Sequence, residues 1–310
     1  MAAGSLMACG TLLKPEPSRV AGACSHIVVV AVLLLSSAAS APAYFETFLK
    51  GEYDSNVNRG INDSEGDGSF SVQLVTQKQP TGESRLEWLY AASLQATTYL
   101  TYDDLNYAEL SLSPGLLYRV RTGVTAALNP IVQLRAVRDS AQSSVTVGGQ
   151  ASLSEQVSRR LYLTQYYSYQ QSFARDDTYS FGAHSAGLVG GIVLTGRLQG
   201  SLTYEFSYGD SFRGVGPAGG RGAGGGGGSG QGQGSGQGQG SGEGGLGRFS
   251  PAFQQGVIKE KVTRHAIGTG LQIDFGRSWT GALQYVYSIW DGDSGTSHAH
   301  LGSFSIGRRF

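Results

Sequence analysis

Histidine and serine are the residue types whose spacing in this chain first suggests chemistry. His184 precedes Ser185, and Ser297 precedes His298. A histidine within hydrogen-bonding reach of a serine hydroxyl can activate that hydroxyl as a nucleophile, as in a Ser–His hydrolase. Adjacent residues of a strand point to opposite faces, so neither neighbouring pair can form the dyad by itself. No lipase motif accompanies them. We therefore predict no catalytic residue and keep a lipid-modifying hydrolase as an alternative.

The potential metal-binding side chains do not form a complete set of ligands. His298 and His300 share a face two residues apart, with only Asp291 and Asp293 nearby in the sequence. Structural zinc sites need four ligands, usually with thiolates or further imidazoles. The 2 cysteines both lie within the first 43 residues, so the rest of the chain can form neither a disulfide framework nor a thiolate site. We predict no metal and no cofactor.

Charged side chains that alternate with apolar ones form the third candidate set. An arginine facing lipid costs about 2–4 kcal/mol at the middle of a bilayer, so such charges are expected to face a polar interior. Both signs occur, which predicts no strong ion preference. The alternative is that the charges pair across strands and plug the interior. The predicted pore-lining residues are Arg85, Glu87, Glu109, Arg135, Glu205, Arg264 and Asp274.

Period-two alternation predicts the elements that position these charges. Trp88, Tyr90 and Leu94 share one face of a segment whose other face carries Glu87 and Gln95. Many such segments exceed ten residues, whereas strands of soluble proteins cluster near ~5–6 and a tilted membrane strand needs ~9–11. We predict twelve strands at 45–57, 69–79, 84–100, 106–118, 122–137, 143–157, 161–173, 178–194, 196–208, 261–275, 279–289 and 298–310.

The connections between these strands alternate in length. The even-numbered ones are tight turns bordered by arginines, whereas the odd-numbered ones are on average longer and carry most of the loop aspartates. Short turns on one side and longer loops on the other are typical of outer-membrane barrels. We expect the turns to face the periplasm and the loops, including 290–297, to face outward.

Composition sets further limits. The chain has 310 residues, with 23 basic and 23 acidic side chains, and this balance argues against a nucleic-acid partner. Much of the glycine lies in 209–256, where a GQGQGS-like repeat cannot bury enough apolar surface to offset its chain entropy. We predict a disordered external loop there. It could be a flexible tether or pore cover, or an insert without a specific role.

The N-terminal segment reads as a targeting signal. Lys14 and Arg19 precede the apolar run 27–35, which is too short to span a bilayer as a helix. Small residues follow and end at Ala41-Pro42-Ala43, a typical cleavage pattern. We predict that 1–43 is a cleaved signal peptide and that 44–310 form the mature domain. The alternatives are a buried core helix or a membrane anchor.

The C-terminal segment carries a resemblance. Phe304, Ile306 and Phe310 share one face of the last predicted strand, and the chain stops on the aromatic residue. This ending resembles that of bacterial outer-membrane β-barrels of the porin-like kind, whose last strand carries the assembly signal. Arg308 departs from the pattern, because an apolar residue is usual two positions before the end. The segment 53–59 (YDSNVNR) resembles the opening strand of barrels associated with exopolysaccharide export or surface-lipoprotein assembly.

The resemblance implies an all-β protein, a twelve-stranded antiparallel transmembrane β-barrel in the outer membrane of a Gram-negative bacterium. Its expected partners are outer-membrane lipid and lipopolysaccharide, the barrel-assembly machinery, and small polar solutes or polysaccharide. The expected function is a passive channel for small polar solutes or polysaccharide segments. The alternatives are the lipid-modifying hydrolase and a plugged structural barrel.

Overall fold

The computed structural model describes residues 43–61, 64–215, 247–248, 256–276 and 278–310. The predicted signal peptide, apart from Ala43, and most of the predicted glycine-rich loop lie outside these residues. Within the described residues, no helix is long and apolar enough to cross a membrane.

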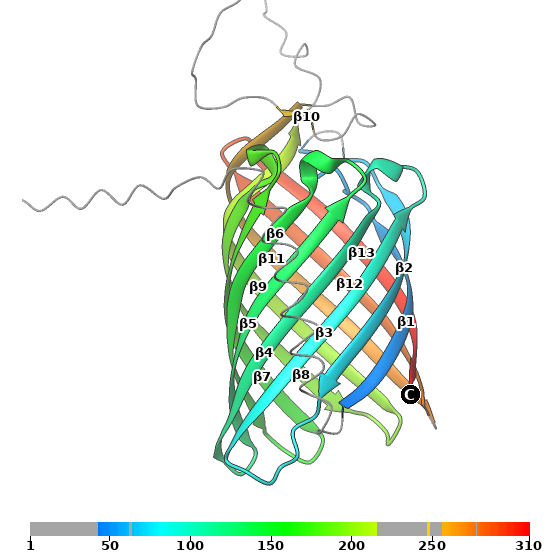
Figure 1. Ribbon diagram of the computed structural model, residues 1–310, viewed down its shortest axis with the longest axis vertical. Coiled ribbons are helices and arrows are strands. Elements are labelled where there is room, and N and C mark those ends of the chain that lie inside the picture. The colour runs from blue at the N-terminus through cyan, green and yellow to red at the C-terminus, as the bar shows by residue number, and fades with distance from the viewer. Residues whose placement is uncertain (1–42, 62–63, 216–246, 249–255, 277) are drawn as a thin grey trace, which may run out of the picture. The chain divides into compact units, whose positions relative to one another are not determined.

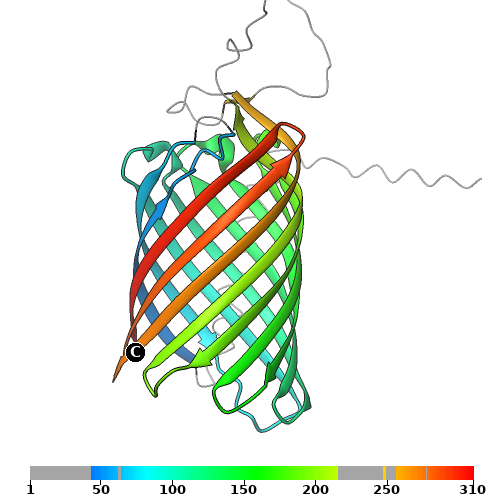
Figure 2. The ribbon, with the colours of Figure 1, turned by 180° about the vertical axis from the view of Figure 1, so that it is seen from behind.

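Twelve long antiparallel strands form one closed sheet, with each long strand bonded to the next long strand along the chain (Figures 1 and 2). β1 pairs with β13 and β9 pairs with β11, which completes the ring, while the two-residue β10 pairs with β11 alone. The predicted twelve-stranded barrel is confirmed. The strands are β1 (Ala43–Asp54), β2 (Asp67–Lys78), β3 (Leu86–Tyr99), β4 (Tyr107–Arg121), β5 (Val124–Val137), β6 (Ser144–Gln156), β7 (Leu161–Ala174), β8 (Phe181–Val193), β9 (Leu198–Val215), β10 (Gly247–Arg248), β11 (Gly256–Gly276), β12 (Trp279–Gly292) and β13 (Gly295–Arg309).

The outer face of the barrel is apolar. Trp88 and Leu202 expose 66% and 63% of their surface, and Leu49 and Leu283 each expose 59%. Water contact with so much apolar surface is unfavourable by about 25 cal/mol per Å², whereas lipid covers it without that cost. An outward apolar band on a closed antiparallel barrel is the arrangement of outer-membrane proteins. The protein is thus an outer-membrane barrel.

β7 carries tyrosines on both of its faces. Tyr167 and Tyr169 point outward, in register with the outward residues of β8, whereas Tyr162 and Tyr166 point into the barrel. Tyr162 lies directly over Gly191 of β8, where an added Cβ would be 1.8 Å from the ring. Glycine on β8 therefore makes room for inward aromatic rings.

The two ends of the barrel differ as expected. Tight turns close one end, which we call the turn end. The other, which we call the loop end, carries the short 3-10 helices η1 (Asp103–Leu105), η2 (Ser140–Gln142) and η3 (Asp177–Tyr179) between strands (Figure 1).

Two loop-end predictions of irregular structure were wrong. β12 and β13 continue through the expected loop 290–297 and leave a turn of only Asp293 and Ser294. Gly295, which follows this turn, has a φ of +125°, a conformation that favours glycine. β9 also continues to Val215, so 209–215 pair with β11 instead of starting the glycine-rich loop.

The last strand is bonded to the first. The Phe310 N–H donates to the carbonyl of Phe45 at 2.8 Å, and Phe304 and Ile306 lie exposed on the outer face. Arg308 extends over the rings of Trp279 and Phe310, at 5.4 and 4.9 Å from their centroids. An arginine at this position is accommodated because its guanidinium lies over two aromatic rings, a favourable cation–π arrangement. Reading of this strand by the assembly machinery stays a prediction.

Candidate channel constriction

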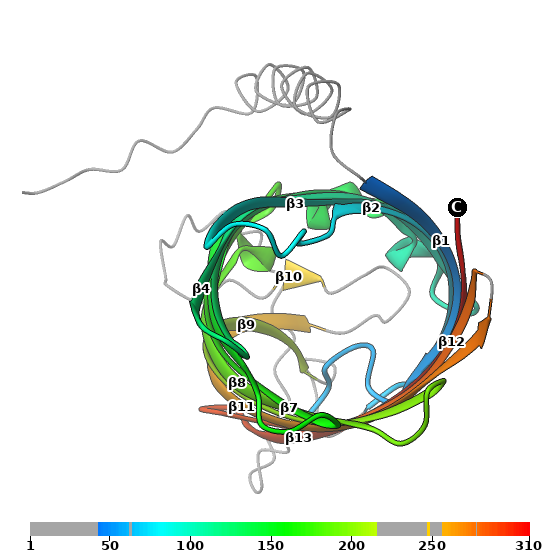
Figure 3. The same ribbon diagram turned by 90° about the horizontal axis from the view of Figure 1, so that it is seen from below.

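The connection between β1 and β2 folds into the barrel at the loop end. Figure 3 shows the blue segment that follows β1 inside the ring of strands. Asn58 is fully buried, and its carbonyl accepts a hydrogen bond from Gly214 of β9 at 3.2 Å. The side-chain amide of Asn56 donates to the carbonyl of His298 on β13 at 3.0 Å. The segment is therefore attached to two separate parts of the wall.

Asparagine side chains fix the conformation of this inserted segment. The Gly60 N–H donates to the side-chain oxygens of Asn56 at 2.8 Å and of Asn58 at 3.1 Å. Asn58 also accepts from the Glu65 N–H at 3.0 Å. Such side-chain-to-backbone bonds replace the ladder bonds that a loop lacks. They hold Arg59 in the left-handed region, with φ of 51°.

Arg59 is the cation that this segment brings into the lumen. Its guanidinium donates to the Ser211 hydroxyl at 3.3 Å and lies 4.5 Å from the centroid of the Phe212 ring. Within the described residues, no carboxylate oxygen lies within 4.0 Å of it. Burial, and next the charge of Arg264, lowers the pKa of Arg59 to about 10, so it is still charged at neutral pH.

A cavity of about 510 Å³ lies beside Arg59, inside the barrel. Its walls come from β1, the inserted segment and the strands β7 to β9 and β11 to β13. Besides Arg59, its inward-facing charged residues are Asp54, Glu205 and Arg264. Asp210 also borders the cavity, but its carboxylate lies 3.9 Å from Lys261 on the outer face. Serines make up much of the remaining lining, so water and solute hydroxyls can find hydrogen-bonding partners throughout.

Two of the predicted pore residues meet in the wall of this cavity. Arg264 of β11 donates to Glu205 of β9 at 2.7 Å and to the Ser288 hydroxyl at 3.2 Å. The other oxygen of Glu205 accepts from the Tyr166 hydroxyl at 2.6 Å. The pair is thus compensated within the wall, in contrast to Arg59.

Glu109 and Arg135 form a second inward pair on β4 and β5. Their side chains approach to 3.9 Å, and the Arg135 guanidinium lies 3.8 Å from the centroid of the Tyr107 ring. Arg135 also contributes to lowering the pKa of Arg59, so its charge acts on the same part of the lumen.

The other three predicted residues lie at the turn end. Glu87 accepts from the backbone N–H groups of Thr81 at 2.7 Å and Gly82 at 3.0 Å, and it also contacts Arg119. Asp274 accepts from the Gly276 N–H at 2.7 Å.

Arg85 precedes β3 and is exposed. Its guanidinium donates to the Arg119 carbonyl at 3.1 Å and lies 5.0 Å from the Tyr118 ring, which is on the outward face. Strand alternation could not place Arg85, because this residue is not in a strand. Alternation also missed Arg59, for the same reason. The available signal was the pair of asparagines at 56 and 58, which favour a tight local turn.

The described histidines face outward, and none of their imidazole rings is bonded to a serine. Each imidazole Nδ1 lies within hydrogen-bonding distance of a tyrosine hydroxyl instead. No group of three or more potential metal ligands occurs within the described ranges. The pairs are His184–Tyr167 at 2.6 Å, His265–Tyr204 at 2.9 Å, His298–Tyr287 at 2.8 Å and His300–Tyr285 at 2.7 Å.

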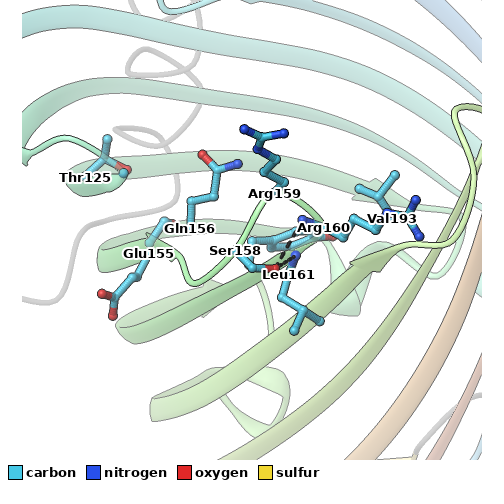
Figure 4. Close-up of a pocket in the computed structure, with 11 residues that line it drawn as sticks. Thr125, Glu155, Gln156, Ser158, Arg159, Arg160, Leu161 and Val193 are labelled. Carbon is cyan, nitrogen blue, oxygen red and sulfur yellow. Dashed lines mark hydrogen bonds between the residues drawn. The ribbon is translucent and has the colours of Figure 1, made fainter.

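A second pocket, of about 370 Å³, lies at the turn end where β6 leads into β7 (Figure 4). Arg159 and Arg160 line it, and the Leu161 N–H donates to the Ser158 hydroxyl at 3.1 Å. Its basic lining comes from the turn itself, so we assign it to the turn rather than to the path through the barrel.

No family model and no curated protein matches the chain. Solved structures do resemble it. The COG4313 outer membrane channel from Pseudomonas putida F1 has a TM-score of 0.54 at 9% identity, over 86% of this chain and 96% of that one. The NanC porin has a TM-score of 0.47 at 10% identity, over 84% and 98%, and the KdgM porin 0.43 at 8%, over 86% and 99%. At 9% identity the likeness to the COG4313 channel is one of fold alone.

Proposed function

We propose that the protein is a passive channel for small polar solutes or segments of polysaccharide. The observation that carries this proposal is the inserted segment, which places Arg59 beside a polar cavity inside the barrel. A pore of this kind selects by its width and by the charges at its narrowest part. Hydroxyl and amide groups along the wall replace the water that a solute loses on entry.

The charge distribution supports a solute class without a large net charge. Arg264 is paired with Glu205, and Arg135 approaches Glu109, so their fields largely cancel in the lumen. Arg59 and Asp54 line the same cavity with opposite charges. Neutral or dipolar polar solutes, including sugars, fit such a lining better than ions of a single sign.

A plugged barrel is the second candidate, because an apolar cluster lies at the loop end. Leu105, Tyr179 and Val257 are buried against one another, and Val57 and Phe212 pack on them. These residues come from well-separated connections and strands, so their contact supports a covered mouth.

The experiment is planar-bilayer recording of the purified protein in a KCl gradient. A channel gives stepwise conductance. Arg59→Gln then shifts the reversal potential toward cation preference, because it removes a cation without a carboxylate partner. Arg85→Gln is the matched control and leaves the potential unchanged, since Arg85 is exposed at the turn end. Absence of conductance steps in the native protein would favour the plugged barrel.

A lipid hydrolase is not proposed, since every described imidazole is bonded to a tyrosine. For biogenesis, we infer that 1–43 are removed on export and that the assembly machinery reads Phe304, Ile306 and Phe310. We also propose that the glycine-rich connection faces outward, since it joins β9 and β11 at the loop end.

A further inference from the structure

All four described histidines lie on the outer wall of one side of the barrel. His184 is on β8, His265 on β11, and His298 and His300 on β13. Together with their tyrosine partners Tyr167, Tyr204, Tyr285 and Tyr287 they form what we call the imidazole belt. Figure 2 shows the part of this wall formed by β9 and β11 to β13 facing the viewer. Transport through the lumen makes no use of these outward side chains.

Each imidazole of the belt is held in one orientation. The Tyr287 ring stacks on His298 at a centroid distance of 6.0 Å, and the Phe206 ring meets His265 edge-on at 5.3 Å. In a neutral imidazole, a hydroxyl that donates to Nδ1 leaves the ring proton on Nε2. In that tautomer each ring presents one N–H donor on the side away from its tyrosine.

The belt lies where the apolar band ends. On β11, Ile267 and Leu271 follow His265 toward the turn end and are exposed, whereas Lys261 lies on the same face toward the loop end. Lys261 is 3.9 Å from Asp210 and 5.7 Å from the Tyr208 ring centroid. On β13, the exposed Phe304 and Ile306 likewise follow the two histidines. This sequence of apolar, aromatic and charged groups marks the depth of lipid headgroups.

The opposite side of the outer wall is different. At its loop end, β2 to β6 and the adjoining loops expose Phe70, Leu100 and Val147, with no imidazole among their described residues. An aromatic girdle alone would explain either side. An aromatic girdle does not explain why the described imidazoles occur only on β8, β11 and β13.

We propose that the imidazole belt binds the phosphorylated saccharide headgroup of an outer-leaflet lipid. At headgroup depth a fixed Nε2–H needs an acceptor, and phosphate oxygens are the strongest acceptors that the outer leaflet offers. Lys261, four residues before His265 on the same outer face of β11, supplies a cation. The inference depends on the placement of the barrel in the outer membrane, and it holds whether or not the lumen conducts.

The experiment uses the full mature chain in detergent, titrated with diphosphorylated lipid A and followed by native mass spectrometry. The belt variant replaces His184, His265, His298 and His300 by Gln, and a second variant replaces only the last two. The control replaces Phe70, Leu100 and Val147 by Gln on the opposite side. Heat-dependent mobility on gels verifies that each variant forms a barrel.

We expect the belt variant to bind lipid A roughly tenfold more weakly, the double variant to lie between, and the control to match the native protein. Dephosphorylated lipid A should bind all four proteins equally. Equal binding of phosphorylated lipid A by native protein and belt variant would overturn the proposal. So would a native dimer that dissociates in the belt variant, which would assign the surface to a second copy of the chain.

Discussion

The charged groups at the two ends of the lumen are of the same types but are used differently. At the turn end, Glu87 accepts from two backbone N–H groups and contacts Arg119, so its charge is satisfied within the wall. At the loop end, Arg59 is held by a hydroxyl and an aromatic face, with no described carboxylate within 4.0 Å. Whether a charged side chain contributes to the stability of the barrel or to the selection of the solute therefore depends on its bonding partners, and not on its residue type.

The difference follows from how a charge projects its field. Two opposite charges in contact form a dipole whose field falls off rapidly, whereas a single charge beside a cavity acts across the whole opening. We therefore expect substitutions at the loop end to change conductance and selectivity. Substitutions at the turn end should change stability and leave conduction alone.

The largest effect is expected from releasing the inserted segment. The double variant Asn56→Ala/Asn58→Ala removes the side-chain bonds to Gly60, Glu65 and His298. At about 1 kcal/mol for each hydrogen bond, roughly 3–5 kcal/mol of local stability is lost. The segment then leaves the lumen part of the time. Single-channel recording should show a higher mean conductance with flickering steps.

Asn129→Ala is the control for this variant. Asn129 lies on the inner wall of β5 and, among the described residues, forms no hydrogen bond to the inserted segment. Its conductance should match that of the native protein. Steps of native size and sharpness in the double variant would mean that the inserted segment does not restrict the pore.

The fold could be predicted from the sequence, but only part of the constriction could. Alternation assigned Glu205 and Arg264 to the inner face, because period two fixes the face of every residue within a strand, and both line the cavity inside the barrel. Their partners Tyr166 and Ser288 depend on strand tilt and register between strands, which alternation does not specify. Arg59 and the turn between β12 and β13 lie where alternation gives way to local turn chemistry.

A turn-end substitution should affect the barrel without affecting the current. Glu87→Gln weakens the acceptor for the Thr81 and Gly82 N–H groups and leaves Arg119 without its carboxylate partner. We expect the temperature at which the barrel unfolds on gels to fall by roughly a few degrees. Conductance and reversal potential should remain native. A shifted reversal potential would show instead that Glu87 acts on the solute path.

The smallest effect is the response of Arg59 to pH. Its pKa of about 10, lowered from 12.5 by burial and by Arg264, means that the side chain keeps its proton below pH 9 and loses it as pH rises through 10. Loss of this positive charge moves selectivity toward cations. The difference in reversal potential between the native protein and Arg59→Gln should therefore be constant from pH 6 to about pH 8.5 and shrink between about pH 9 and 11.

Because tyrosines and lysines that titrate in the same range are present in both proteins, the difference isolates Arg59. A difference that persists unchanged at pH 11 would mean that the guanidinium is better hydrated than its position suggests. A difference that vanishes near neutral pH would mean that Arg59 is not the charge that sets selectivity.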